Sequence, residues 1–91
     1  MNNNRYRKKP VIIEAVHLAA LNTDATIAIP TWFMLAVASG IIKQSTTGEA
    51  IVTTLEGDML AGNTDWIIKG VQGELYPCKD EIFKATYEKA E

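Results

Sequence analysis

The sequence is poor in the residues that carry most recognisable chemistry. Its 91 residues include one cysteine, Cys78, and one histidine, His17. A single thiol cannot form an intrachain disulfide, and no charged-then-apolar leader opens the chain, so we expect a reducing compartment, the cytoplasm. His17 has no cysteine or second histidine with which to complete a metal shell. We therefore expect no metal and no cofactor.

Catalytic motifs are also missing, because the sequence has no phosphate loop and no nucleophile with an identifiable base. Cys78 precedes Lys79, which could lower the thiol pKa, but nothing marks a base or an oxyanion site for it. Neighbouring carboxylates could in principle form acid–base pairs, namely Glu56 with Asp58 and Asp80 with Glu81. Turn and helix-cap chemistry explains both pairs more simply. We expect no enzyme, and a small hydrolase is the least favoured alternative.

The chain has no uninterrupted apolar run long enough to cross a bilayer. Residues 25–42 carry no charge, but Pro30 and Gly40 interrupt them. The continuous apolar part is about ten residues, against the roughly 18 that a spanning helix needs. This composition favours a buried helix, and we expect no membrane partner.

Charge is low overall but unevenly placed. The formal net charge is −2, yet Arg5, Arg7, Lys8 and Lys9 crowd the first nine residues, while most acids lie in the second half. This asymmetry disfavours a protein that coats nucleic acid in general and leaves a local anion site open. Apolar residues make up 47% and charged ones 22% of the chain, which is an ordinary globular mixture. We expect one domain, residues 1–91, with residues 1–4 disordered.

The hydrophobic pattern predicts a small α+β fold. Pro30 and Gly40 fit the two ends of a helix over residues 30–39, and the apolar spacing near the chain end predicts a second helix over residues 80–90. Residues 18–24 are predicted to be a connection with a turn at 22–24. The expected strands are 11–16, 41–44, 50–55 with a bulge or turn into 59–61, 66–69 and 74–78. We predict a mainly antiparallel sheet with two helices in the order β-α-β-β-β-β-α.

The first predicted helix is apolar almost all round. The residues responsible are Trp32, Phe33, Met34, Leu35 and Val37. A helix that is buried on every side needs a second covering layer, and another copy of the chain can supply it. We therefore predict a homo-oligomer through these five residues. The alternative is that loops and the sheet cover both faces within one monomer.

Three blocks of sequence form a distinctive series. Residues 6–15 read Y-R-K-K-P-V-I-I-E-A, residues 54–57 read T-L-E-G, and residues 65–79 read D-W-I-I-K-G-V-Q-G-E-L-Y-P-C-K, followed by I-F at 82–83. Together they resemble a family of small phage and prophage proteins for which no general activity is settled, and they span nearly the whole chain in the family's order. Two positions depart from its pattern. Thr64 replaces a glycine, which makes a positive φ angle there less favourable, and Asp80 replaces a proline, which predicts a side-chain cap for the second helix.

The resemblance implies a phage accessory protein that acts by binding, either blocking a host defence protein or sequestering a defence signalling nucleotide. Basic side chains could bind its phosphates and aromatic rings could stack on its base. The expected ligand-binding residues are Tyr6, Arg7, Lys8, Lys9, Trp66, Lys69, Tyr76 and Lys79. Simpler roles are also open, because the cations could protect a strand edge from aggregation and the rings could pack in the core. The alternative function is a structural or regulatory module that contacts a phage or host protein through the apolar first helix.

Overall fold

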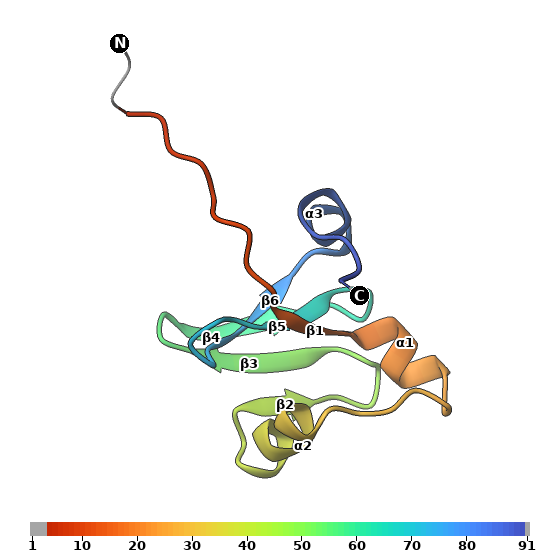
Figure 1. Ribbon diagram of the computed structural model, residues 1–91. Coiled ribbons are helices and arrows are strands. Elements are labelled where there is room, and N and C mark those ends of the chain that lie inside the picture. Colours follow the sequence, from red (N-terminus) through yellow and green to blue (C-terminus); the bar gives the residue numbers. More distant parts are fainter. Residues whose placement is uncertain (1–3, 91) are drawn as a thin grey trace.

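The computed structural model describes residues 4–90 and shows nine elements (Figure 1). The strands are β1 (Glu14–His17), β2 (Ile42–Gln44), β3 (Ala50–Thr54), β4 (Gly57–Ala61), β5 (Trp66–Lys69) and β6 (Leu75–Cys78). The helices are α1 (Leu18–Thr23), α2 (Thr31–Ala38) and α3 (Asp80–Thr86). The α+β class predicted from the sequence is confirmed. Disorder was predicted for residues 1–4. Residues 1–3 of that segment lie outside the residues that the structure describes.

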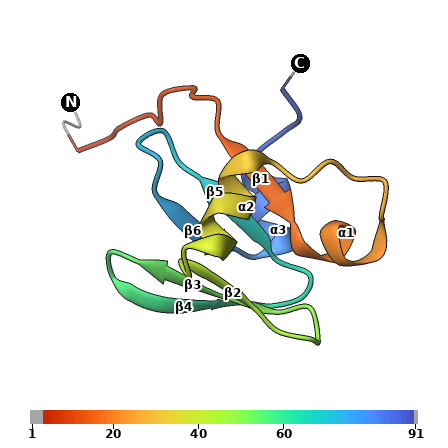
Figure 2. The same cartoon turned by 90° about the horizontal axis from the view of Figure 1, so that it is seen from below.

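The strands form two antiparallel sheets rather than the single sheet predicted. One has the order β1-β5-β6 and the other the order β2-β3-β4. In the first sheet Val16 lies opposite Ile67, and Ile67 lies opposite Pro77. Helix α2 lies beside β2 on the lower side of the molecule (Figure 1) and stands in front of the strands when the molecule is seen from below (Figure 2). The two sheets therefore share one interior, which α2 closes on one side.

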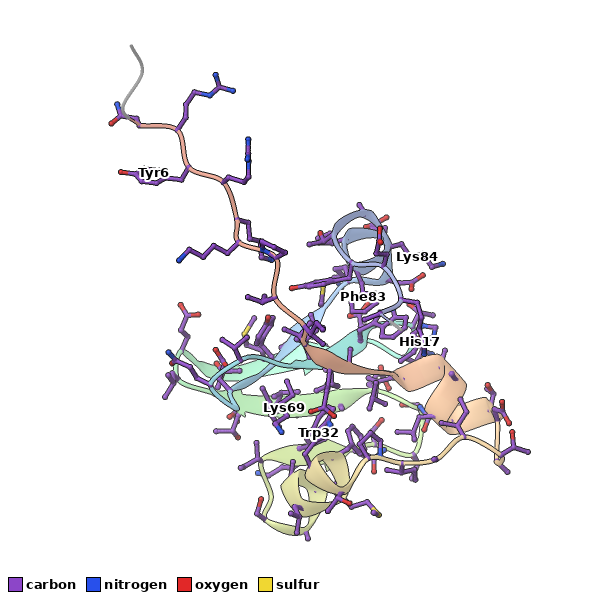
Figure 3. All side chains as sticks on the ribbon, viewed as in Figure 1. Tyr6, His17, Trp32, Lys69, Phe83 and Lys84 are labelled. Carbon is purple, nitrogen blue, oxygen red and sulfur yellow. The ribbon has the colours of Figure 1, made fainter. Side chains whose placement is uncertain are left out.

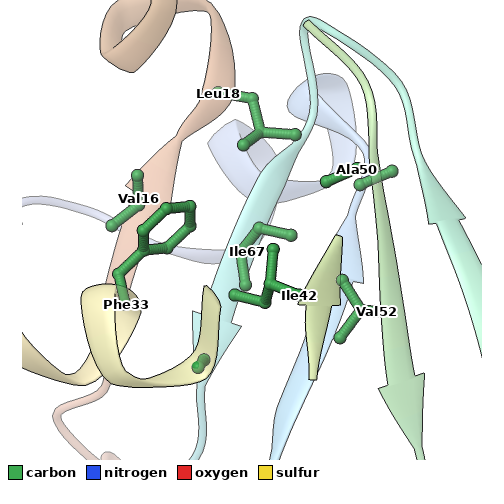
Figure 4. Packing of buried hydrophobic residues seen from close by; sticks show 9 residues of the cluster. Val16, Leu18, Phe33, Ile42, Ala50, Val52 and Ile67 are labelled. Carbon is green, nitrogen blue, oxygen red and sulfur yellow. The ribbon is translucent and has the colours of Figure 1, made fainter. Parts of the chain in front are cut away.

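The core occupies that shared interior (Figure 4). Its members come from both sheets, from α1 and from α2: Val16, Leu18, Phe33, Ala36, Ile42, Ala50, Val52, Ala61 and Ile67. Burial of each large aliphatic or aromatic side chain of this kind contributes about 1.5–3 kcal/mol. The small alanines on β3 and β4 allow the two sheets to approach closely.

The predicted helix over 30–39 is confirmed as α2, and local chemistry explains its ends. Pro30 is the N-cap residue, and Gly40 after the helix has a φ of +83°. Glycine adopts this left-handed backbone without the steric cost that a side chain brings. Proline at the start loses no hydrogen bond, because the first N–H groups of a helix have no partner within it.

The five apolar residues of α2 do not share one environment. Phe33 is 2% exposed in the monomer's own core, so its predicted role in a subunit interface is wrong. Trp32 and Val37 are half-buried against that core. Met34 and Leu35 are 49% and 64% exposed. Only part of the helix therefore remains apolar and uncovered, which agrees with neither sequence-based alternative in full.

Several boundaries differ from the sequence-based prediction. Residues 18–23 form α1 instead of a connection, and Leu18 at its start is buried and donates its N–H to Asp65 O at 3.0 Å. Residues 59–61 belong to the separate strand β4, which turns back on β3 at Gly57, whose φ is +104°. The last helix ends at Thr86 and not at residue 90.

The N-terminal arm, residues 5–13, extends away from the body (Figure 1). The strand predicted for 11–16 begins only at Glu14, because its partner β5 ends at Lys69 and the chain then turns. Lys8 Nζ lies 5.0 Å from the centre of the Tyr87 ring. Such an exposed contact is worth about 0.5–1 kcal/mol. Because fixing each backbone residue costs about 1–2 kcal/mol, this contact alone does not hold the arm in place.

Within residues 4–90, no helix is both long enough and apolar enough to cross a lipid bilayer.

Candidate functional site: a column of rings beside a cleft

The outer face of the β1-β5-β6 sheet carries the molecule's main cluster of aromatic and charged side chains. The register places His17, Trp66 and Cys78 in one row across the three strands. Since side chains alternate between the faces of a sheet, this row points away from the core that Val16 and Ile67 enter. Helix α3 lies over this outer face (Figure 1). The face is therefore a second, smaller layer of packing.

Four rings form a continuous stack on this face, which we call the ring column: His17, Trp66, Phe83 and Tyr87. The His17 and Trp66 centroids are 4.6 Å apart at 16°, and those of Trp66 and Phe83 are 3.8 Å apart at 7°. Tyr87 follows Phe83 at 5.1 Å and 33°. Figure 3 shows His17 and Phe83 on the same side of the molecule, near Lys84. The column joins β1, β5 and α3.

Asp80 is the polar centre of the column. Its Oδ1 accepts a hydrogen bond from Trp66 Nε1 at 2.8 Å, and its Oδ2 lies 3.0 Å from Lys84 Nζ. The hydrogen bond from Trp66, followed by that from Lys84, lowers the pKa of the Asp80 carboxyl. The prediction that Asp80 caps α3 is wrong, because Lys79 is the N-cap residue and makes no side-chain cap. A proline at position 80 could not make either contact of Asp80.

His17 is oriented by two oxygen atoms. Its Nε2 lies 3.0 Å from the carbonyl oxygen of Thr64 and 3.7 Å from Asp80 Oδ1. A carbonyl oxygen only accepts, so Nε2 carries the hydrogen and donates it to Thr64. Thr64 stands where the family has a glycine, and a positive φ angle was therefore not expected there. The structure agrees, because the φ angle of Thr64 is not positive. His17 therefore has a structural role that ties β1 to the turn before β5.

A cleft of about 590 Å³ lies between the base of the N-terminal arm and the ring column. Its lining combines three of the rings with aliphatic and charged groups: Val11, Ile12, Ile13, Glu14, Ala15, Pro30, Trp66, Phe83, Lys84, Tyr87, Glu88, Lys89 and Ala90. Its charged groups are two cations and two anions. Lys8, which lies over Tyr87, adds a third cation next to the lining. The cleft can hold a ligand of the size typical for small-molecule sites.

Only some of the eight predicted ligand-binding residues meet at this cleft. Trp66 lines it, and Lys8 lies at its margin over Tyr87. Tyr76 is on the same face of the sheet, opposite Ile68. Burial, followed by a hydrogen bond with Tyr87, raises the pKa of Tyr76 to about 12.

The other five predicted residues lie elsewhere. Lys69 Nζ is 3.6 Å from Glu14 Oε2, and Lys79 Nζ is 3.5 Å from Asp65 Oδ2. Tyr6, Arg7 and Lys9 are exposed on the N-terminal arm, and Figure 3 shows Tyr6 far from Lys69. The structure therefore does not bring the eight residues into one site.

Sequence reasoning missed most of the residues that build the cleft. Phe83 and Tyr87 contribute to the apolar spacing that predicts the last helix, and their separation of four positions also brings the two rings into contact. Asp80 and Lys84 have the same spacing and form an ion pair. The position of His17 beside Trp66 has no local sequence signal, because it depends on the pairing of β1 with β5.

Cys78 has the properties of a packed thiol. Burial, and next the negative charge of Asp65, raise the pKa of Cys78. The raised pKa is the opposite of the lowered thiol pKa that the position of Lys79 next to Cys78 suggested from the sequence. Asp65 is itself buried, and its Oδ2 accepts the N–H of Gly62 at 2.8 Å. In residues 4–90, no three histidine, cysteine, aspartate or glutamate side chains are grouped as metal ligands.

Comparison with protein-family models, with curated proteins and with solved structures finds no match to this chain.

Proposed function

We propose that this is a non-enzymatic binding protein of phage or prophage origin that sequesters a nucleotide-type signalling molecule in the cleft beside the ring column. The observation that carries the proposal is the combination, within one cleft, of flat aromatic walls and lysine side chains. A role against a host defence is what the resemblance to the phage family implies. Inhibition of a host defence protein is the related possibility within the same proposal.

Tyr87 offers the most accessible ring for a nucleotide base. Trp66 is covered by His17 on one face and by Phe83 on the other, so a base could not stack on it without opening the column. Tyr87 ends the column, and the charged end of the exposed Lys8 side chain lies over its ring. A base could replace Lys8 there and gain stacking of about 1–3 kcal/mol.

The phosphate groups would be bound by lysines at the cleft. Lys84 and Lys89 belong to its lining, and the Lys84 side chain is 70% exposed. Lys84 can therefore turn from Asp80 to a phosphate without leaving a buried charge unpaired. The arm cations Arg7 and Lys9 lie close in sequence to Lys8 and can approach the same ligand. Binding of this kind weakens when salt screens the charges.

A second candidate function is supported by the uncovered part of α2. Met34 and Leu35 are exposed on an otherwise apolar helix. Together with the half-buried Trp32 and Val37 they could form a contact with another protein, including another copy of this chain. This surface supports a protein-interaction module and the homo-oligomer expected from the sequence.

Thermal unfolding in the presence of linear and cyclic nucleotides tests the proposed function. A ligand that binds only the folded state raises the unfolding temperature, and the shift keeps growing with the logarithm of the ligand concentration above its Kd. We expect the shift to be lost in a Lys84→Ala, Lys89→Ala double variant and in a variant with Arg7, Lys8 and Lys9 replaced by alanine. Lys43→Ala is the matched control, because Lys43 is exposed on β2, outside the cleft lining.

The ligand recovered after denaturation separates the competing classes. A sequestering protein returns it intact, whereas an enzyme returns a product. If no nucleotide shifts the unfolding temperature, or if the lysine variants shift as the natural protein does, the ligand proposal is abandoned. Copurification of a protein that Leu35→Ser releases would instead support the interaction module.

A further inference from the structure

The N-terminal arm has the composition of a strand but pairs with no strand among residues 4–90. None of the backbone groups of residues 5–13 makes a hydrogen bond with another residue of the described chain. Val11, Ile12 and Ile13 are β-branched and continue directly into β1. Ile12 is 79% exposed, although residues of this type favour a packed sheet. The arm therefore lacks the second strand that its residues favour.

The strand that the arm extends is itself at a sheet edge. β1 pairs with β5 on one side, and the sheet order β1-β5-β6 leaves its other side open. Open edges with exposed apolar side chains readily pair with another chain. The arm and β1 together present one continuous edge over residues 11–17.

We propose that the N-terminal arm is a dimerisation strand. In a two-fold dimer, the arms of two copies run antiparallel along each other and along the free edge of β1. The two three-stranded sheets then form one continuous sheet of six strands across the dimer. This surface is distinct from the α2 surface and does not depend on the ligand proposed above.

Symmetry determines which side chains share a face in such a pair. A two-fold axis between antiparallel strands passes through a residue and its own counterpart, so that odd-numbered residues always lie opposite odd-numbered ones. In β1 the odd-numbered His17 lies on the face of the ring column, whereas Val16 enters the core. Arg7 and Lys9 of the second copy would therefore lie on the ring-column face and Lys8 on the opposite face, so that pairing replaces the contact that Lys8 makes with Tyr87 in the monomer.

The charge distribution fits an exchange of arms between copies. The arm carries four cations and no acid, whereas residues 14–91 carry five cations and eleven acids, a net charge of −6. Antiparallel pairing places the cations of each arm against the acidic body of the other copy. It also keeps the two cationic clusters at opposite ends of the pair, where salt largely screens their repulsion.

Pro10 and the cations also limit the pairing to two copies. Proline has no N–H to donate, so a regular ladder is interrupted at position 10. In the two-fold pair each arm uses the free edge of the other's β1, and no β1 edge remains for a third copy. The result is a closed dimer and not a filament.

Mass measurement in solution combined with a proline substitution tests the dimer. We expect the natural chain to have twice the monomer mass and Ile12→Pro to be a monomer that keeps the helix signal of its circular dichroism spectrum and unfolds cooperatively. The fold should survive, because residue 12 makes no backbone hydrogen bond with another of the residues that the structure describes. Leu35→Ser, which changes the α2 surface, should remain a dimer. A monomeric natural chain, or a dimer that Leu35→Ser dissociates and Ile12→Pro does not, overturns the proposal.

Cysteine crosslinking provides a readout that does not depend on the proline variant. Single cysteines are placed at positions 11, 12 and 13 in a Cys78→Ser background and oxidised. The residue on the two-fold axis faces its own counterpart, so one of the three positions should crosslink far faster than a control cysteine at Thr46 in the β2–β3 loop. Equal, slow crosslinking at all four positions contradicts antiparallel pairing of the arms.

Discussion

Trp66 and Asp80 connect β5 to α3 through a 2.8 Å hydrogen bond from the indole N–H to the carboxylate. α3 has no buried residue, so this bond and the stacking of Phe83 on Trp66 are its principal attachments to the sheet. A helix attached by few contacts opens more easily than the core. The α3 wall of the cleft should therefore open more easily than the core.

Replacing Trp66 with phenylalanine should raise the pKa of Asp80 towards its usual value. The change keeps a ring for stacking but removes the hydrogen bond that is the largest cause of the lowered pKa. Because the pKa of Asp80 is lowered in the folded state, ionised Asp80 stabilises the fold at pH values above the usual carboxyl pKa. This stabilisation is lost as the pH falls through the lowered pKa. Carboxyl titration by NMR measures the change. Asp24, whose pKa is lowered by Thr26, is the control and should not move.

The fold should lose stability at high pH because of Tyr76. Burial and Tyr87 raise the pKa of Tyr76 to about 12, above the usual value of 10.0. Between these two values the unfolded chain loses the phenolic proton while the folded chain keeps it, so the free energy of unfolding falls as the pH rises. Chemical unfolding at several pH values should show this fall, and Tyr76→Phe should reduce it. If the free energy of unfolding falls with pH as steeply in Tyr76→Phe as in the natural protein, groups other than Tyr76 cause the fall.

Trp32→Phe should change the free energy of unfolding by less than about 1 kcal/mol and in the stabilising direction. The Trp32 Nε1 group is buried and has no hydrogen-bond partner among the described residues, so its removal ends a desolvation cost. The neighbouring Phe33 is the matched contrast, because Phe33→Ala leaves a cavity in the core and should cost about 3–5 kcal/mol. Urea unfolding measures both. A large loss in Trp32→Phe would indicate that the indole has a partner in solution.

Gly73→Ala should cost about 1 kcal/mol because it forces a side chain into left-handed backbone. Gly73 has a φ of +84°, and an added methyl would meet no atom within 4 Å, so the cost is conformational. Gly70→Ala in the same turn is the control. Its methyl would first meet the exposed carboxylate of Glu74, which can move away at the cost of the hydrogen bond that Oε1 accepts from the Gln72 N–H at 3.0 Å. Equal losses in the two variants would show that the turn does not keep this conformation.

The elements that could be predicted from the sequence are those with local signals. Pro30 and Gly40 mark the two ends of α2, and the turn at residues 70–73 marks the β5–β6 hairpin. α1 could not be predicted, because six residues are too few to show a helical period. The separation of two sheets was also missed, since alternation within a strand does not specify which strand lies beside it.

The candidate site was predicted only in part for the same reason. Trp66 and Lys8 were expected at a binding site and lie at the cleft. Lys69 and Lys79 instead lie next to the acids Glu14 and Asp65. The sequence shows that basic and aromatic residues are present. Which of them meet at one site, and which lysines lie next to an acid instead, depends on strand register and on the position of α3.

The sequence by itself determined the α+β class, the ends of α2, the closing hairpin and a basic segment before the first strand, because turn residues and hydrophobic periods act over a few positions. Only the tertiary structure decided that Phe33 enters the core, that His17 and Phe83 enclose Trp66, and that the first strand begins at Glu14. These outcomes depend on contacts between distant positions, such as His17 with Thr64 and Trp66 with Asp80. Such contacts form only when packing brings the elements together.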